Sequence, residues 1–120
     1  MPHLVIEHSR NLGDFPFDRI VPALNRSVTA HPSILDAMDL KTRVVAHSQV
    51  RVGNEDEGHA FVHAQLRLLA GRSAEAKREL AERVADVLRE HLPRPPGLTL
   101  QLSVEIVDMD RGSYVKERLA

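Results

Sequence analysis

Apolar and polar residues alternate in four segments of the chain, which is the pattern of strands with one buried face. In residues 59–68 the apolar face would hold Ala60, Val62, Ala64, Leu66 and Leu68. In residues 98–107 it would hold Leu98, Leu100, Leu102, Val104 and Ile106. Residues 2–8 (PHLVIEH) and 41–52 (KTRVVAHSQVRV) alternate more loosely but are rich in branched side chains. We therefore predict four strands over these ranges.

Two further segments have apolar residues at helical spacing. A short helix is predicted from about residue 18 to residue 31, on the spacing of Ile20, Leu24 and Val28. Its expected N-cap is Asp18, and Pro22 would lie in the first turn, where a missing N–H costs least. A longer helix is predicted from Ser73, its N-cap, to about Leu92, with an apolar stripe of Ala76, Leu80, Val84, Val87, Leu88 and Leu92.

The order strand, helix, strand occurs twice, which predicts an α+β fold built from two βαβ units. The first unit would span residues 2–52, the second residues 59–107, and residues 108–120 would form a tail on a single domain of residues 1–120. Right-handed crossovers make each strand pair parallel, giving one four-stranded mixed sheet with both helices on one face. The other face would carry Val5, Val45, Phe61 and Val107, so we expect an oligomer.

Composition narrows the possible functions. The formal net charge is −1, so no basic surface suggests nucleic acid as a partner. There is no cysteine, which excludes disulfides, thiolate metal sites and cysteine nucleophiles. No apolar run approaches the ~20 residues of a membrane span and no signal peptide precedes the first strand, so we expect no membrane partner and a cytoplasmic location.

Two stretches are more specific than this general pattern. MPHLVIEHS at the amino terminus and HAFVHAQLRLLAGRS at residues 59–73 resemble the 5-carboxymethyl-2-hydroxymuconate isomerase family of the tautomerase superfamily. LKTRV at residues 40–44 and LSVEIVDMD at residues 102–110 are similar to strands of the same family. The resemblance covers nearly the whole chain, and the most specific part is residues 60–73.

The resemblance implies a tautomerase fold, a homotrimer, and an isomerisation that depends on an amino-terminal proline. The implied substrate is a small, unsaturated 2-hydroxy or 2-oxo carboxylate from the breakdown of aromatic compounds, and no metal or organic cofactor is implied. The chain departs from the family in having VVAHSQVRVGN at residues 44–54, where relatives tend to carry aromatic residues. This departure concerns the natural substrate more than the fold.

The residues themselves support a proton transfer at Pro2. If Met1 is removed, Pro2 has a free secondary amine; if Met1 is retained, the nitrogen is an amide and no base exists. A partly dry pocket beside arginines would lower the pKa of the amine, which could then act as a general base. The protonated amine could return the proton elsewhere on the same substrate.

An anionic substrate requires cations near Pro2. Arg72 follows the third strand and precedes a capped helix, where its guanidinium could bind a carboxylate. If the first and third strands are antiparallel neighbours, the start of one meets the end of the other, so Pro2 and residues 71–73 converge. Arg43 is a further candidate for a carboxylate or enolate, and Lys41 lies two positions away on the same strand face. Either could come from a neighbouring subunit.

Each of these residues also has an ordinary structural interpretation. Met-Pro starts are common, Arg72 could be a surface residue at a helix start, and Arg43 could be a solvated strand residue. His59 and His63 fit HxxxH, but on a strand the two lie roughly 13 Å apart, so we predict no metal site. His3 is expected to serve packing.

Two other functions remain open from the sequence. The fold could support a hydratase or dehalogenase of unsaturated acids that uses the same Pro2 as an acid. It could also be a non-catalytic trimeric binding module.

Overall fold

The computed structural model describes residues 1–120, and each predicted element is present in it. Along the chain these are β1 (His3–Ser9), α1 (Phe17–Thr29), β2 (Lys41–His47), β3 (His59–Leu69), α2 (Ala74–His91) and β4 (Thr99–Met109). The tail after β4 contains one short 3-10 segment, Arg111–Ser113. No helix is both long and apolar enough to cross a membrane.

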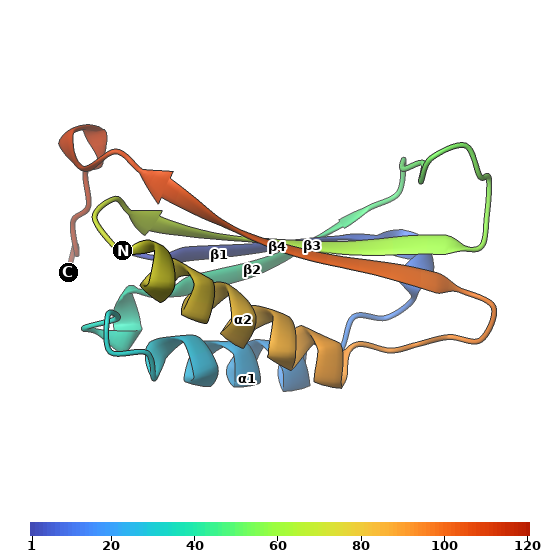
Figure 1. The fold of residues 1–120 in the computed structure, drawn as a ribbon, viewed down its shortest axis with the longest axis horizontal. Coiled ribbons are helices and arrows are strands. Elements are labelled where there is room, and N and C mark those ends of the chain that lie inside the picture. Colours follow the sequence, from blue (N-terminus) through green and yellow to red (C-terminus); the bar gives the residue numbers. More distant parts are fainter.

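The four strands form one mixed sheet in the order β2-β1-β3-β4. Strands β1 and β2 are parallel, as are β3 and β4, while the central pair β1 and β3 is antiparallel. Both helices lie under one face of this sheet (Figure 1). The prediction of two βαβ units with both helices on one face is therefore confirmed.

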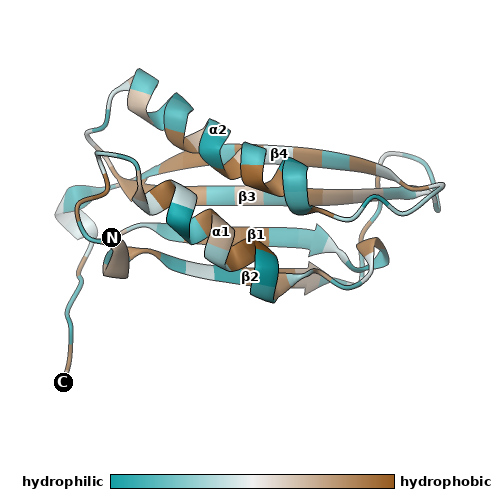
Figure 2. Ribbon diagram, turned by 90° about the horizontal axis from the view of Figure 1, so that it is seen from below, coloured by the Kyte–Doolittle hydropathy of each residue, from teal (hydrophilic) through white to brown (hydrophobic).

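The core lies between the sheet and the helices. Alternate residues of β3 supply one wall, and all five apolar positions predicted for it are at most 1% exposed. The helices supply the other wall through Ile20, Leu24 and Val28 of α1 and Leu80, Val84 and Leu88 of α2. Figure 2 shows both helices in front of the sheet, with hydrophobic and hydrophilic residues alternating along each helix. Strand β4 is at the sheet edge, so its apolar residues are only half-buried.

Three details of the predicted elements are wrong: the end of β2, the N-cap of α1 and the place of Pro22 in α1. Strand β2 ends at His47 rather than at residue 52, because its partner β1 ends at Ser9, which is paired with His47. Helix α1 begins at Phe17 after Pro16, so Asp18 is in the first turn rather than at the N-cap. Pro22 is consequently the sixth helical residue and lies beyond the first turn.

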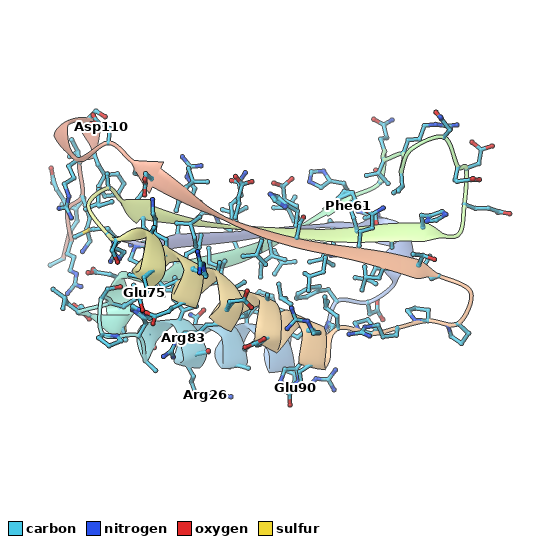
Figure 3. The ribbon with its side chains drawn as sticks, viewed as in Figure 1. Arg26, Phe61, Glu75, Arg83, Glu90 and Asp110 are labelled. Atoms are coloured by element: carbon cyan, nitrogen blue, oxygen red, sulfur yellow. The ribbon has the colours of Figure 1, made fainter.

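The sheet face away from the helices carries both apolar and polar side chains. Figure 3 shows Phe61 on this face, and Val45 is 41% exposed there. The same face carries two histidine–carboxylate pairs: His47 Nε2 is 2.7 Å from Glu7, and His63 Nε2 is 2.5 Å from Glu105. The face is thus open, partly apolar and partly charged.

Candidate functional site

Three chain segments meet at one edge of the sheet. His3 at the start of β1 is paired with Arg67 near the end of β3, because these strands are antiparallel. Leu69 at the end of β3 is paired with Met109 at the end of β4, because these strands are parallel. The amino terminus therefore lies beside the turn from β3 to α2 and the turn after β4 (Figure 1), which is the convergence expected from the topology.

A small cavity of about 150 Å³ lies at this edge. Met1, Arg72 and Arg111 line it together with Ser33 and Asp39. Two arginines thus share a cavity with the amino terminus, although each arginine lies some seventy or more positions from Met1 along the chain. Pro2 itself is buried directly behind Met1.

The terminal amine lies in a partly desolvated and charged environment. The Met1 nitrogen is 3.4 Å from Asp39 Oδ2. Burial lowers the pKa of this amine below the ordinary value, and Lys41 and Lys116 add to that effect, while Asp39 opposes it. The next residue is anchored, because the Pro2 carbonyl accepts a 3.1 Å hydrogen bond from the Lys41 N–H. The Met1 amine therefore lies beside Asp39 and is shifted toward its neutral form.

Arg72 lines the cavity, and hydrogen bonds to the protein fix its side chain. Its Nε donates to Ser33 Oγ at 3.1 Å, one terminal nitrogen donates to the Ser33 carbonyl at 2.9 Å, and the other donates to the Leu69 carbonyl at 3.3 Å. A guanidinium has five N–H groups, so one N–H on each terminal nitrogen has no protein acceptor. Two donors are thus available for an anion. Burial, followed by nearby Arg111, lowers the pKa of Arg72, which stays charged.

Arg111 was missed at the sequence level. It follows β4, and its Nε donates to the Ala70 carbonyl at 2.5 Å, beside Gly71. Parallel pairing of β3 with β4 brings residues that follow the two strands to the same edge. That pairing is the signal that could have indicated Arg111.

Arg43 and Lys41 do not line this cavity. Arg43 lies on the sheet face away from the helices, in an open groove of about 470 Å³ that His3, Arg67 and Tyr114 also line. Lys41 is half-buried beside His3, its neighbour in the β1–β2 register. Within one chain, the structure therefore brings Arg72 to the amino terminus and leaves Arg43 on another surface.

His3 does more than the packing role expected of it. Its Nδ1 accepts from Arg43 at 3.1 Å, and its Nε2 bonds the Tyr114 hydroxyl at 2.8 Å. The Tyr114 hydroxyl is in turn 3.5 Å from the Met1 carbonyl oxygen. Burial and the surrounding cations lower the pKa of His3, which favours the neutral imidazole. This hydrogen-bonded series connects the Arg43 groove to the amino terminus.

The HxxxH histidines have separate environments. His63 bonds Ser103 Oγ at 2.7 Å in addition to Glu105, whereas the buried Nδ1 of His59 has no partner. The structure contains no group of three or more His, Cys, Asp or Glu side chains that could hold a metal ion.

Comparison with known structures supports the fold. A crystal structure of a 5-carboxymethyl-2-hydroxymuconate isomerase from Deinococcus radiodurans R1 is 29% identical and has a TM-score of 0.88, over 98% of this chain and 90% of that one. A 5-carboxymethyl-2-hydroxymuconate delta-isomerase is 21% identical with a TM-score of 0.67, over 100% and 89% of the chains. A fused 4-OT asymmetric trimer is 15% identical with a TM-score of 0.67, over 95% and 91%. No curated protein sequence matches the chain.

A family comparison goes further than the fold. The family model of 5-carboxymethyl-2-hydroxymuconate isomerase matches residues 2–119, which is nearly the whole chain and begins at Pro2. The resemblance noted in the sequence is thereby confirmed. The chain belongs to the 5-carboxymethyl-2-hydroxymuconate isomerase family and is an isomerase with the tautomerase fold.

Proposed function

We propose that the chain moves a proton within a small, unsaturated 2-hydroxy or 2-oxo carboxylate, such as 5-carboxymethyl-2-hydroxymuconate, with Pro2 as the base and acid. The observation that carries the proposal is the shared cavity of the amino terminus, Arg72 and Arg111. The substrate would come from the breakdown of an aromatic compound, and the reaction would use no metal or organic cofactor.

The proton would pass through the Pro2 nitrogen once Met1 has been removed. The neutral amine takes the proton of the 2-hydroxyl group, the oxygen electrons form the C=O bond, and the displaced C=C electrons take a proton at carbon from the protonated amine. Atoms and electrons balance without an oxidant. The burial that lowers the pKa of the Met1 amine would act on Pro2, since Pro2 is itself buried.

Arg72 would bind a substrate carboxylate with its two unpartnered N–H groups. Arg111 adds positive charge to the same cavity. Removal of Met1 would also enlarge the cavity, because Met1 forms part of its wall.

Arg43, with Lys41 beside it, would bind the second carboxylate or the enolate across a subunit boundary. Neither side chain lines the cavity of its own chain. The open sheet face, where Arg43 lies, offers a surface for association. We propose a homotrimer, the state described for the fused 4-OT structure.

Two measurements on the purified chain test this function: the amino-terminal residue by mass spectrometry, and ketonisation of 2-hydroxymuconate and phenylenolpyruvate by absorbance. A protein that starts at Pro2 should ketonise the dicarboxylate. Arg72→Ala should raise KM for 2-hydroxymuconate by roughly tenfold or more, on the scale of a lost charged hydrogen bond. It should raise KM for phenylenolpyruvate, which has one carboxylate, by less. The same substitution of Arg51, an exposed residue paired with Asp56, is the control.

A Pro2-start protein with no turnover of any such enol would contradict the proposal. Turnover of a halogenated or hydratable unsaturated acid instead would indicate dehalogenase or hydratase chemistry on the same fold. Binding of the dicarboxylates without any turnover would indicate a binding module.

A further inference from the structure

The position of the Arg72 guanidinium is set by Ser33, in the connection between α1 and β2. Two of the three hydrogen bonds that Arg72 donates end on this residue, one on Oγ and one on the carbonyl oxygen. The third ends on the Leu69 carbonyl at the end of β3, three residues before Arg72. Ser33 is thus the contact that fixes Arg72 to another part of the fold.

Ser33 is held in turn by the buried imidazole of His31. The Ser33 backbone N–H donates to His31 Nδ1 at 3.1 Å, and Ser33 Oγ is 2.9 Å from the same nitrogen. Because a backbone N–H can only donate, Nδ1 has no proton. Because Ser33 Oγ accepts from Arg72, its own hydrogen is free to point to Nδ1.

The other nitrogen of His31 fixes the ring from the opposite side. Nε2 is 2.9 Å from Glu79 Oε1 on α2. The side chain of His31 is 6% exposed, whereas that of Glu79 is 55% exposed. The proton positions require a neutral imidazole with its hydrogen on Nε2, donating to Glu79. Both nitrogens of this buried side chain therefore have partners, as burial of a polar group requires.

We propose that His31 and Ser33 are positioning residues that fix the Arg72 guanidinium for carboxylate binding, with Glu79 orienting the imidazole. The inference rests on the proposed role of Arg72. The hydrogen bonds Arg72–Ser33–His31–Glu79 connect the β3–α2 turn, the α1–β2 connection and the second turn of α2. Arg72 then meets the substrate in a preformed conformation, and less side-chain freedom is lost on binding.

Four variants separate this role from simple structural support. Ser33→Ala removes the Oγ link and, at a half-buried position, should leave the fold intact. His31→Gln keeps a donor near the place of Nε2 but loses the acceptor at Nδ1, whereas His31→Asn keeps an acceptor near Nδ1 and loses the donor to Glu79. Ser48→Ala, at an exposed residue outside these contacts, is the control.

Three readouts apply to each variant: KM and kcat for 2-hydroxymuconate, Kd for the non-tautomerising dicarboxylate cis,cis-muconate by calorimetry, and the ¹⁵N NMR signals of Arg72 Nε–H and the His31 ring. Ser33→Ala and His31→Gln should raise KM and Kd roughly tenfold, as for a hydrogen bond to a charged group, with kcat within about twofold of wild type. Both should also lose the protected Arg72 Nε–H signal. His31→Asn and Ser48→Ala should keep Kd near wild type, and the wild-type ring should show the hydrogen on Nε2.

Arg72→Ala distinguishes the two possible failures. If it leaves Kd for cis,cis-muconate unchanged, the proposed role of Arg72 is wrong and the inference fails with it. If it raises Kd while Ser33→Ala does not, Arg72 binds the carboxylate but the positioning role is wrong. Equal impairment of His31→Asn and His31→Gln would also contradict the inference, because the acceptor at Nδ1 would then make no difference.

Discussion

At the scale of single residues, the surroundings of the amino terminus change the pKa of its amine. Burial and the ammonium groups of Lys41 and Lys116 favour the neutral form, while Asp39 favours the charged form. Burial has the largest effect, so the pKa is lowered. Arg72 and Arg111 supply positive charge in the same cavity without competing as bases.

The first prediction at this scale concerns pH. A base works only when unprotonated, so kcat/KM should fall as the pH falls through the pKa of the Pro2 amine. Burial lowers the pKa of the Met1 amine, and Pro2 is itself buried, so the midpoint should lie below the ordinary pKa of a proline amine. Rates of 2-hydroxymuconate ketonisation from about pH 5 to about pH 9 measure it. A flat profile over this range would exclude the amine as the base.

A second prediction concerns Asp39, whose carboxylate bonds Lys116 and Arg118 of the tail. Lys116 first, and then Arg118, holds the pKa of Asp39 well below its usual range. A depressed folded-state pKa means that this stabilisation is present above the unfolded pKa of about 3.9 and is lost as the pH falls toward the folded value. The tail should therefore stay anchored at about pH 5. Asp39→Asn should release it and speed tryptic cleavage after Lys116 several-fold.

Mass spectrometry of the released fragments gives the cleavage rates. Asp56→Asn, which breaks an exposed pair with Arg51 far from the tail, is the matched control. Equal cleavage rates for Asp39→Asn and the control would show that Asp39 does not anchor the tail.

The positions of some of these residues could be predicted from the sequence, and those of others could not. Arg72 follows a recognisable strand and precedes a capped helix, so its place at the sheet edge follows from topology. His31 lies two residues after the end of α1 and has no recognisable pattern around it. Its distant partner, Glu79, is defined only when the two helices pack. Arg43 was expected near the site, but the alternation of β2 places it in the groove on the open sheet face.

At the scale of elements, a regular alternation of apolar residues and a clear helix cap predicted the bounds of strands and helices well. Looser apolar patterns did not. Strand β3 ends within one residue of its prediction, because its five alternating apolar residues face the helices. The Ser73 cap of α2 is also as predicted, with Oγ accepting from the Ala76 N–H at 3.1 Å. The end of β2 could not be predicted, because it depends on where its partner strand stops.

Pro22 gives the prediction at this scale. It lies exposed on the sixth residue of α1, where it removes a helical hydrogen bond without contributing to the core. An interior proline costs about 3 kcal/mol, partly offset by about 1 kcal/mol of lost unfolded-state freedom. Pro22→Ala should therefore raise the free energy of unfolding by about 2 kcal/mol, measured by urea denaturation at a fixed protein concentration.

Pro96→Ala is the control, because Pro96 is exposed in the loop before β4. It should leave stability unchanged or slightly lower. A Pro22→Ala variant no more stable than Pro96→Ala would mean that α1 accommodates its proline without cost.

At the scale of the whole molecule, the fold leaves one sheet face uncovered. That face holds the Arg43 groove, partly exposed valines and two histidine–carboxylate pairs. The cavity at the amino terminus reaches only one of the two predicted carboxylate-binding arginines within a single chain. Association through the open face would supply the second from a neighbour.

The corresponding prediction is a homotrimer in solution. Light scattering coupled to size exclusion should give a mass three times that of the single chain. Phe61→Asp, on the open face (Figure 3), should lower that mass, whereas Arg26→Asp, on the exposed side of α1, should not. A monomeric wild-type protein would contradict the trimer and the contribution of Arg43 from a neighbour.

The central claim is that a free Pro2 nitrogen transfers the proton, and blocking that nitrogen tests it most directly. Two proteins are compared in the 2-hydroxymuconate assay: the chain that starts at Pro2, and the same chain with one alanine before Pro2, which converts the amine to an amide. The Pro2-start protein should turn over the substrate, and the blocked protein should be slower by at least about a hundredfold, the lower range for loss of a general base. Equal rates for the two proteins would show that the proton is moved by another group.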